Sequence, residues 1–434
     1  MLSLFRKKPK GKVTVVGLDG VPFSFLSRMV AEGVMPQVSR ISEKGRSLRR
    51  MNVVFPEISA VSWPSFMTGV DPGTHGVYGF TDLVPGSYAV RFPQFGDVAS
   101  PTLWDKLSER GKVSVVINQP STYPARKLNG ALISGFVAVD LLKAVYPTKY
   151  LGALKRMNYA VDLDTSRARK DADFLFRELE RILTIREEVS NSLRSQENWD
   201  YFEIVITGTD RLQHYQMHAI MDPKEPNHER AMEYYRKVDG FIGRLYERHL
   251  AETKDEGANF LMLSDHGFTL IEQEVNITSW LVENGYLRFE GEGRSLDDIA
   301  VDSKAFALDP GRIYLNLKNR YPKGSVNPAD AEELKNELCQ KLAQLSFDDK
   351  TVLRRIFRPE EIFHGPHCER APDLLAWAHD GFDLKASLDH GPVFRRTDLT
   401  GMHTQHDAFL HAPGADFSNG VAITDLFENI LSRY

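Results

Sequence analysis

The stretch KVTVVGLDG, residues 12–20, decides the fold of this chain. It is a short run of β-branched and aliphatic residues that stops at Asp19 and Gly20. Two later stretches have the same form, YFEIVITGTD at residues 201–210 and NFLMLSDHG at residues 259–267. A continuous apolar run of this length is typical of a strand that is buried on both faces of a parallel sheet.

Each of these three runs leads into an aspartate. The aspartates are Asp19, Asp210 and Asp265, and His266 follows the last of them. In open α/β sheets, ligands bind outside the carboxyl ends of the strands. The sequence therefore predicts that these three carboxylates, far apart along the chain, converge on one metal site.

The rest of the chain alternates strand-like and helical patterns, which favours an α/β fold with a central, mostly parallel sheet flanked by helices. The stretch 271–358 mixes turns, a short strand and a charged helix, and we interpret it as a smaller inserted cap beside a core of residues 1–270 and 359–434. The other predicted strands cover 112–118 and 131–136, and the predicted helices cover 20–40 (interrupted at Met35-Pro36), 171–193, 230–250 and 423–432.

The composition is that of an ordinary globular protein. The chain has 434 residues and a net charge of −5, which argues against a nucleic acid polymer as its partner. It has no run apolar enough for a transmembrane helix, and its basic start (Arg6 to Lys12) lacks the apolar region of a signal peptide. The two cysteines, Cys339 and Cys368, have no metal-type spacing. A single possible disulfide in a chain this long is weak evidence for secretion, so we expect a cytoplasmic location.

Histidines beside the aspartates supply candidate metal ligands. Asp210 and His214 are four residues apart, so on a helix they share one face. Asp265 and His266 both reach one ion only where the chain turns, and Gly267 permits such a turn. The plain alternatives are a solvent-facing Asp–His pair for the first and a helix N-cap with an incidental histidine for the second.

Three further histidines lie close together in TGMHTQHDAFLHAPG, residues 400–414. They are His403, His406 and His411. Three imidazoles in nine residues are unusual for a loop, although surface histidines in a loop remain the alternative.

The candidate nucleophile lies in PEISAVSWPSFMTGVDPGTHGVYGF, residues 56–80. This stretch offers Ser59, Ser62 and Ser65, and a hydroxyl becomes a useful nucleophile when a base or a metal lowers its pKa. No G-x-S-x-G elbow surrounds these serines, which argues against a Ser-His-Asp hydrolase. Activation by a metal is the more natural route.

Together, these residues carry a resemblance to a known family. Five ordered pieces, GLDGVP, SAVSWPSFMTGVDPGTHGVYGF, TDRLQHY, LSDHGF and GMH, span Asp19 to His403. In this the chain resembles the alkaline phosphatase superfamily, and within it the type I phosphodiesterase/nucleotide pyrophosphatase family. The resemblance implies an alkaline-phosphatase-like core and hydrolysis of phosphate esters, most specifically of phosphodiesters or nucleotide pyrophosphates.

The resemblance also implies two metal sites. One ion would be held by Asp210, His214 and His403, and the other by Asp19, Asp265, His266 and the nucleophile. The family places its nucleophile nine residues before the Thr of a T-G pair, which gives Ser59, with Ser62 as the fallback. Many members place an Asn three residues after the nucleophile, where this chain has Ser62, and His75 in the P-G-T-H-G turn is read as structural.

The expected cofactors follow from these ligands. Mixed imidazole and carboxylate ligation suits two divalent ions, with Zn²⁺ favoured and Mn²⁺ as the alternative. Such a pair can clamp the attacking and leaving oxygens of an in-line displacement, which would pass through a phosphoseryl intermediate at Ser59. The charges of Asp19, Asp210, Asp265 and a Ser59 alkoxide would balance those of the two ions.

Other functions stay open at this point. A phosphomutase or a phosphomonoesterase of the same superfamily would keep the same ligands, and the region 271–358 could be the cap that a mutase needs. A sulfatase is rejected because SAVSW at Ser59 lacks the C/S-x-P-x-R signature, and a metal-free binding protein is the remote alternative. The expected substrate is a small phosphorylated molecule, such as a nucleotide or a sugar nucleotide, and no oligomeric state is predicted.

Overall fold

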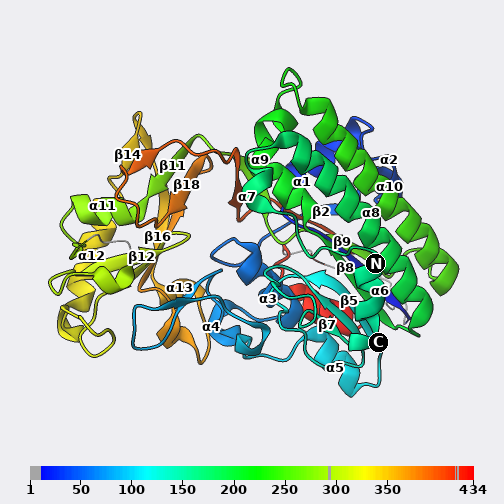
Figure 1. Cartoon of the computed structure of the whole chain (residues 1–434), viewed down its shortest axis with the longest axis horizontal. Helices are drawn as coiled ribbons and strands as arrows, with labels where there is room; N and C mark the ends of the chain where they lie inside the picture. Colours follow the sequence, from blue (N-terminus) through cyan, green and yellow to red (C-terminus); the bar gives the residue numbers. More distant parts are fainter. Residues whose placement is uncertain (1–10, 292–294, 416, 418–419) are drawn as a thin grey trace, which may run out of the picture. The chain divides into compact units, whose positions relative to one another are not determined.

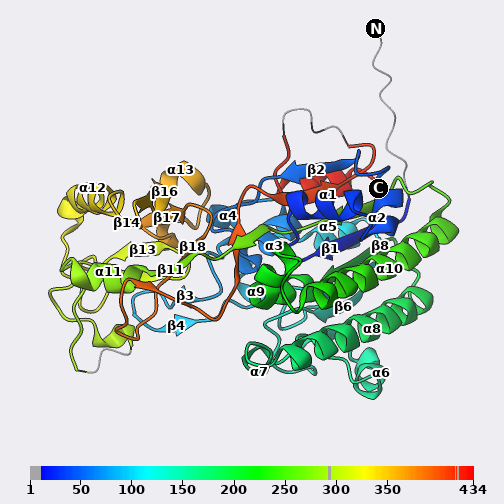
Figure 2. The same ribbon diagram turned by 90° about the horizontal axis from the view of Figure 1, so that it is seen from above.

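A computed structural model describes residues 11–291, 295–415, 417 and 420–434, and the basic residues before residue 11 lie outside this part. The chain forms two compact units. The larger comprises the chain up to Val70, Gln94–Phe268 and Leu399–Tyr434, and the smaller comprises Asp71–Pro93 and Thr269–Asp398. Figures 1 and 2 show the elements of both units in two perpendicular views.

The larger unit is built on an eight-stranded sheet in the order β2-β21-β9-β1-β8-β5-β6-β7. The strands from β9 to β6 pair in parallel, and the pairs that involve β21, β2 and β7 are antiparallel. This confirms the predicted α/β fold with a mostly parallel central sheet. The strands are β1 (Val13–Leu18), β2 (Leu48–Met51), β5 (Ser114–Gln119), β6 (Gly130–Ser134), β7 (Val145–Tyr146), β8 (Tyr201–Ile206), β9 (Phe260–Leu263) and β21 (Ala408–His411).

The register of the three central strands brings their carboxyl ends to one edge. Leu18 at the end of β1 is the partner of Ile206 at the end of β8, and Gly17 is the partner of Leu263 at the end of β9. The residues that follow these strands therefore emerge side by side. This confirms the predicted convergence at the level of the backbone.

Helices cover both faces of this sheet. Along β1, Thr14 faces α10, where its Oγ1 lies 3.0 Å from His249 Nδ1, whereas Gly17 faces Trp63 on α3. Because side chains alternate along a strand, this contrast separates the two faces. The helices of the larger unit are α1 (Phe23–Ala31), α2 (Pro36–Ile41), α3 (Ser59–Thr68), α5 (Leu103–Glu109), α6 (Leu151–Arg156), α7 (Thr165–Ala168), α8 (Ala172–Gln196), α9 (Gly208–Met221), α10 (His228–Thr253) and α14 (Asp425–Leu431).

The predicted helices agree with these elements. The expected interruption at Met35-Pro36 separates α1 from α2, and Pro36 is the first residue of α2, where its missing N–H costs no hydrogen bond. The long amphipathic helix is α8, whose N-terminus is capped by the Asp171 carboxylate accepting from Phe174 N. Its apolar side chains belong to the main core together with those of α10 and of the sheet.

The smaller unit has its own core around two main sheets and two hairpins. The sheets have the orders β12-β13-β17-β16 and β18-β11-β19. The strands of the two sheets are β11 (Gln273–Asn276), β12 (Ala305–Leu308), β13 (Arg312–Leu315), β16 (Leu353–Phe357), β17 (Leu374–Ala378), β18 (Phe382–Lys385) and β19 (Phe394–Arg395). The hairpins and helices are β3 (Asp82–Leu83), β4 (Val90–Arg91), β14 (Ser346–Phe347), β15 (Lys350–Thr351), α4 (Pro72–His75), α11 (Ile277–Glu283), α12 (Ala331–Leu342) and α13 (Pro359–Ile362).

The bounds of the smaller unit differ from those expected for the cap, which were 271–358. The unit begins close to the expected start but continues to Asp398 and also includes Asp71–Pro93. It continues because β17 pairs with β13 and β16, and β18 pairs with β11, so residues after 358 complete its sheets. Whether the unit acts as a cap stays a prediction.

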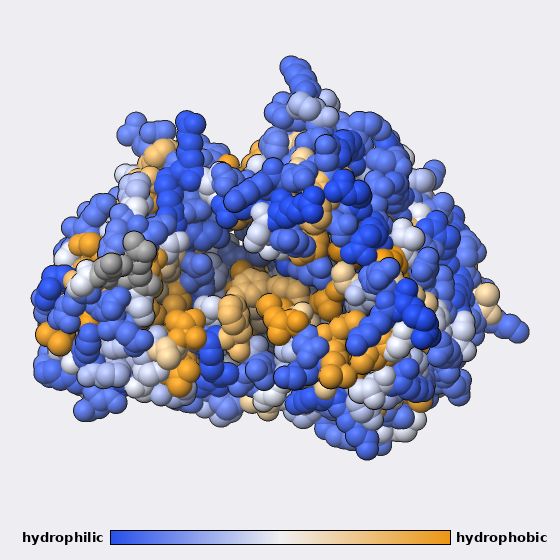
Figure 3. All heavy atoms as spheres, viewed as in Figure 1, coloured by the Kyte–Doolittle hydropathy of each residue, from blue (hydrophilic) through white to orange (hydrophobic). Residues whose placement is uncertain are grey.

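In the described part of the chain, no helix is both long and apolar enough to cross a membrane. Figure 3 shows one face of the molecule, on which hydrophilic side chains predominate and hydrophobic ones gather in a few places. Cys339 and Cys368 are both free thiols.

A buried glutamate in the centre of the sheet makes the stability of the chain depend on pH. Burial raises the pKa of Glu203 on β8 to about 8, although Tyr201 Oη donates to Glu203 Oε2 at 2.6 Å. Because the pKa is higher in the folded state than in the unfolded state, the stability associated with this group is complete at acidic pH. It is lost as the pH rises through about 8.

We therefore expect Glu203→Gln to stabilise the protein at alkaline pH. The gain in the free energy of unfolding should be on the order of 4 kcal/mol near pH 9 and close to zero near pH 4. Urea denaturation of both proteins across this pH range measures it. The exposed Glu283→Gln is the matched control, and the prediction is wrong if the two substitutions show the same pH dependence.

Candidate metal centre

The three predicted aspartates lie at one edge of the central sheet, at the ends of β1, β8 and β9. Asp19 follows β1 directly, Asp265 stands two residues after the end of β9, and Asp210 stands in the first turn of α9, which follows β8. All three side chains are buried. Gly20 adopts a left-handed conformation (φ +70°), and its N–H donates to Asp265 Oδ1 at 3.0 Å, which ties the first and third strand ends together.

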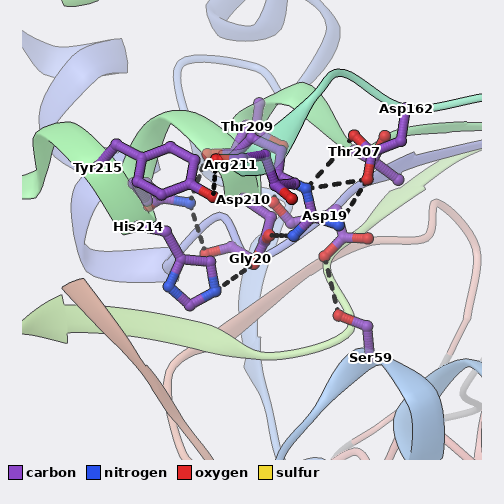
Figure 4. Close-up of polar contacts among 12 residues, drawn as sticks. Asp19, Gly20, Ser59, Asp162, Thr207, Thr209, Asp210, Arg211, His214 and Tyr215 are labelled. Carbon is purple, nitrogen blue, oxygen red and sulfur yellow. Dashed lines mark hydrogen bonds and ion pairs between the residues drawn. The ribbon is translucent and has the colours of Figure 1, made fainter. Parts of the chain in front are cut away.

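Ser59 is the first residue of α3 and joins this group. Its Oγ donates to Asp19 Oδ1 at 3.2 Å and lies 3.1 Å from His266 Nε2. Figure 4 shows the Ser59 hydroxyl pointing toward Asp19. The fallback residue Ser62 is buried on the same helix, and in the described part of the chain its Oγ has no hydrogen-bond partner. The structure thus brings Ser59, rather than Ser62, into contact with the predicted ligands.

The closeness of α3 to β1 depends on Gly17. Trp63 Nε1 on α3 donates to Asp19 Oδ2 at 3.3 Å, and this requires the indole to lie directly on the strand. A Cβ on Gly17 would lie 2.5 Å from Trp63 Cη2 and 3.1 Å from Val205 Cγ2, so no larger residue fits. The glycine therefore fixes the distance between the helix that carries Ser59 and the strand that leads to Asp19.

We expect Gly17→Ala to lower the free energy of unfolding by about 1–3 kcal/mol, because the methyl group overpacks the indole. The displaced indole should also weaken the contact between Ser59 and Asp19. Urea denaturation measures the loss of stability, and the intrinsic fluorescence of the variant reports the displacement of the indole. Gly96→Ala is the matched control, since a Cβ there meets nothing within 4 Å, and equal stabilities of the two variants would contradict the argument.

One group of side chains matches the first predicted site. Ligand atoms of Asp210, His214 and His403 all lie within 4.8 Å of one another. His403 Nε2 lies 3.0 Å from His214 Nε2 and 3.3 Å from Asp210 Oδ1. His214 Nδ1 lies 3.0 Å from the Gly401 carbonyl oxygen, which fixes the ring as an Nδ1–H donor and leaves Nε2 for a ligand.

A second group contains Asp19, Asp210 and His266, again with all ligand atoms within 4.8 Å of one another. The predicted second site instead combined Asp19, His266 and Ser59 with Asp265. Asp265 Oδ2 lies 3.3 Å from His266 Nε2, so it borders this group. Asp210 thus takes part in both groups and is central to the cluster.

The shifted pKa values in this cluster indicate that its carboxylates have too little positive charge around them. Burial raises the pKa of Asp19, and the neighbouring Asp265 and Asp210 raise it further. Burial also raises the pKa of Asp265, to about 7. Burial would raise that of Asp210 too, but the nearby His214, His403 and Arg211 bring it below its usual range. Burial lowers the pKa of His403, because it disfavours the charged imidazolium. The imidazole is therefore neutral, as a metal ligand must be.

Arg211 forms a second layer behind the carboxylates. Its Nη1 donates to Asp210 Oδ2 at 2.9 Å, and its Nη2 donates to Asp162 Oδ2 at 2.6 Å (Figure 4). Asp162 and Asp210 raise the pKa of Arg211 despite its burial. Arg211 therefore orients Asp210 while its own charge is balanced.

Helix α9 is kinked two residues after His214. Gln216 has non-helical angles (φ −136°, ψ 23°) inside the helix. The Thr400 hydroxyl enters the helix here, because it accepts from Met217 N at 2.8 Å while Thr400 N donates to the His214 carbonyl oxygen at 2.8 Å. A side chain that inserts into the hydrogen-bond ladder is a known cause of such kinks.

The comparisons with known proteins agree with this arrangement. The family described as type I phosphodiesterase/nucleotide pyrophosphatase matches residues 13–406, nearly the whole chain. The chain belongs to this family. The predicted resemblance is therefore confirmed, and the matched range contains every predicted site residue. No curated protein sequence matches the chain.

Solved structures of the family's superfamily share the fold across the whole chain. Phosphonoacetate hydrolase from Sinorhizobium meliloti 1021, in complex with phosphonoformate, is 17% identical and has a TM-score of 0.64, with 98% of this chain and 97% of that chain covered. An inactive form of murine ectonucleotide pyrophosphatase/phosphodiesterase 5, in complex with AMP, is 13% identical, with a TM-score of 0.55 and coverages of 98% and 95%. These similarities confirm the predicted alkaline-phosphatase-like fold.

Several histidines that the sequence singled out lie outside the two groups. His411 is buried on β21, where its Nδ1 lies 2.8 Å from Ser47 Oγ, and burial lowers its pKa to about 4. His75 belongs to the smaller unit, where Val77 N donates to its Nδ1. His406 is part-buried and is in neither group. Of the three histidines at 403–411, the structure brings only His403 to the cluster.

Gly267 has a packing role in addition to the predicted one. The chain bends at Asp265 and His266, directly before Gly267, and Gly267 itself does not have a positive φ. It is needed because a Cβ there would lie 2.4 Å from Thr404 Oγ1, where β10 (Gly267–Leu270) pairs with β20 (Gly401–Thr404). That pairing stacks the rings of His266 and His403, whose centroids are 3.8 Å apart.

No pattern in the sequence indicated Asp162, Thr400 or the role of Trp63. Asp162 stands in an irregular segment with no motif around it, and Thr400 acts through a kink that no local pattern indicates. Trp63 is part of the SAVSW piece, so its place in the motif was visible, although its hydrogen bond to Asp19 was not.

Proposed function

We propose that this protein is a metal-dependent hydrolase of phosphate esters, of the phosphodiesterase or nucleotide pyrophosphatase type. The observation that carries the proposal is the cluster at the carboxyl edge of the sheet, made of three buried aspartates, buried His266 and Ser59, and part-buried His214 and His403. Membership of the type I phosphodiesterase/nucleotide pyrophosphatase family supports the same chemistry.

The residues present fit a pair of divalent ions. In the described part of the chain the buried atoms Asp210 Oδ1 and Asp265 Oδ2 accept no assigned hydrogen bond, and the nitrogens nearest to them are imidazole Nε2 atoms of His403 and His266, each 3.3 Å away. Buried carboxylate oxygens without donors are costly unless a cation takes them. Imidazoles mixed with carboxylates suit Zn²⁺, with Mn²⁺ as the alternative, and we propose Zn²⁺.

The predicted ligand sets remain our proposal. Asp210, His214 and His403 would hold one ion, and Asp19, Asp265, His266 and Ser59 would hold the other, with Asp210 close enough to contact both. When bound, such ions would supply Lewis-acid stabilisation of the charges that develop on the attacking and leaving oxygens.

Ser59 would act as the nucleophile. Its Oγ already donates to Asp19 Oδ1, so the carboxylate is placed to accept the hydroxyl proton as Oγ attacks phosphorus. The bond from phosphorus to the leaving oxygen breaks, the leaving group departs as the alcohol or its anion, and the phosphorus stays on Ser59 Oγ with its second ester group still attached. Water then attacks this phosphorus, the bond to Ser59 Oγ breaks, and the serine is regenerated.

The balanced charge of Arg211 favours a diester over a monoester. A monoester carries one more negative charge at the scissile phosphorus and needs a cation to match it. Arg211 lies beside Asp210, but its guanidinium is already paired with Asp162 and Asp210. Solved structures that share this fold include one in complex with AMP and one in complex with phosphonoformate, so nucleotides and phosphonates belong in the substrate screen.

The decisive experiment compares hydrolysis of bis-p-nitrophenyl phosphate with that of p-nitrophenyl phosphate, in Zn²⁺ and in Mn²⁺. We expect metal-dependent turnover of the diester with a clear preference over the monoester. Preference for the monoester would assign the protein to the phosphatases. If the phosphoryl group is passed back to the substrate and takes up no label from ¹⁸O-labelled water, the protein is a mutase. A chain that binds no metal under saturating Zn²⁺ would contradict the proposal. The cytoplasmic location stays a prediction.

A further inference from the structure

A loop with several exposed apolar side chains follows β6 in the larger unit. It covers residues 136–143 and leads into β7. Val137, Val139 and Leu142 are 47%, 83% and 54% exposed, and Val139 is the most exposed large hydrophobic side chain in the described part of the chain. Single apolar residues on a surface are ordinary, whereas a cluster rimmed by polar residues marks an interaction site.

The base of this loop is fixed to the fold. At its start, the ring of the half-buried Phe136 lies 4.8 Å from the Arg211 guanidinium carbon. At its end, the Lys143 carbonyl oxygen accepts from Ala125 N at 2.8 Å. Between them, the partly buried Leu141 packs against the main core. The exposed apolar side chains therefore stand on an anchored loop, which holds them at the surface.

Basic residues accompany the apolar side chains. Lys143 belongs to the loop, and Arg126 and Lys127 directly follow the residue that is hydrogen-bonded to the Lys143 carbonyl oxygen. All three basic residues are exposed, and the Arg126 guanidinium carbon lies 3.6 Å from the centre of the Phe95 ring. Within the part of the chain that the structure describes, neither Lys127 nor Lys143 forms an ion pair.

Two carboxylates also act on this region, and both take part in caps. Asp140 accepts a hydrogen bond from a backbone N–H within the loop, at 2.9 Å. Asp105 belongs to the capping box of α5 and attracts Arg126. The two lysines keep their positive charge at the surface, on a chain whose net charge is −5. The loop is therefore a locally basic site on an acidic protein, which is complementary to an anionic surface.

We propose that the loop of residues 136–143 docks this protein on an anionic lipid surface. The apolar side chains enter the headgroup region, and the basic residues lie on the anionic headgroups. Interfacial binding combines the burial of apolar area with attraction to anionic lipid, and this loop offers both. An uncharged protein partner would cover the apolar side chains but leave the lysines unmatched. The proposal goes beyond the proposed function, because docking does not depend on turnover.

Cosedimentation of the full chain with large unilamellar vesicles tests the proposal. Vesicles that contain phosphatidylserine in phosphatidylcholine are compared with vesicles of phosphatidylcholine alone. We expect partitioning onto the anionic vesicles to be about tenfold stronger or more, since each basic residue near an anionic surface contributes about fivefold. Added salt should weaken the partitioning, because it screens exposed charges.

Val139→Ser separates insertion of the loop from electrostatic attraction alone. We expect this variant to partition about tenfold more weakly onto the anionic vesicles, because it loses apolar area that the lipid would bury. Val301→Ser is the matched control, since Val301 is 61% exposed but belongs to the smaller unit. The control should partition as the natural chain does.

The double variant Lys127→Gln and Lys143→Gln tests the contribution of charge. It should also partition about tenfold more weakly, and its partitioning should depend less on salt. The matched control is Lys224→Gln and Lys318→Gln, which removes the same net charge from exposed positions outside the loop and should change nothing. All of these side chains are exposed, so the variants should fold as the natural chain does.

Several results would overturn the proposal. They are equal partitioning onto both kinds of vesicle, undiminished partitioning of Val139→Ser or of the Lys127 and Lys143 variant, and equal losses in the controls. Self-association in sedimentation velocity that Val139→Ser abolishes, without binding to vesicles, would assign the loop to an interface between two copies of the chain instead. None of these results bears on the hydrolysis of diesters.

Discussion

Ser59→Ala is expected to lower kcat for bis-p-nitrophenyl phosphate by on the order of 10⁴-fold or more, because it removes the proposed nucleophile. The substitution removes only the hydroxyl group of Ser59, which is the smallest possible change at this position. The two side chains in contact with Ser59 Oγ have other contacts of their own, Asp19 with Trp63 Nε1 and His266 with the Gly267 carbonyl oxygen. The fold should therefore be unchanged, and rapid acid quench with ³²P-labelled diester should trap ³²P on Ser59 of the natural chain, as a serine phosphate that keeps the second ester group, and none in the variant.

Ser62→Ala is the matched control for this prediction. It removes the same atom three residues later on α3, from a hydroxyl that is buried and lies outside both ligand groups. A loss of at most about 10²-fold is expected if Ser62 only helps to stabilise the transition state from the position where the family often has Asn. The reverse pattern, with Ser62→Ala inactive and Ser59→Ala active, would make Ser62 the nucleophile.

Asp210→Asn is expected to have the second large effect, the loss of both proposed ions. Asp210 is the only residue common to the two ligand groups found in the described part of the chain. The amide keeps the size of the side chain but removes the charge and one acceptor oxygen. We expect Zn²⁺ content by atomic emission to fall toward zero and kcat/KM to fall by on the order of 10³-fold or more.

Two further variants serve as comparisons for Asp210→Asn. Asp265→Asn should cost one ion rather than two, because Asp265 borders only the second group. Asp222→Asn, an exposed residue at the far end of α9, should cost none. Full metal content in Asp210→Asn would contradict a ligand role for Asp210, whatever the activity of the variant.

Much of the fold and of the centre could be read from the sequence, because both depend on strong local patterns. Runs such as VTVVGL are too apolar to be exposed on either face, which indicates buried parallel strands. Parallel strands in register end together, so Asp19 and Asp265 had to emerge at one edge. The spacing of Asp210 and His214 places both on one face of a helix without any knowledge of the partner elements.

Other features depended on contacts between distant segments. Residues after 358 belong to the smaller unit because they complete its sheets, and strand pairing over such distances leaves no local signature. His403, rather than His406 or His411, joins the cluster because of the β10–β20 pairing. Asp162 accepts a hydrogen bond from Arg211, which lies 49 positions later in the chain.

The sequence by itself determined the α/β class, the strand ends that carry the aspartates and the membership of the family, since periodicity and ordered motifs are properties of the chain alone. Only the tertiary structure decided that Asp210 lies between two ligand groups and that Gly17 and Gly267 are required by close packing rather than by backbone conformation. These features are distances between segments that the chain connects only through its folded core, and no local pattern encodes such distances.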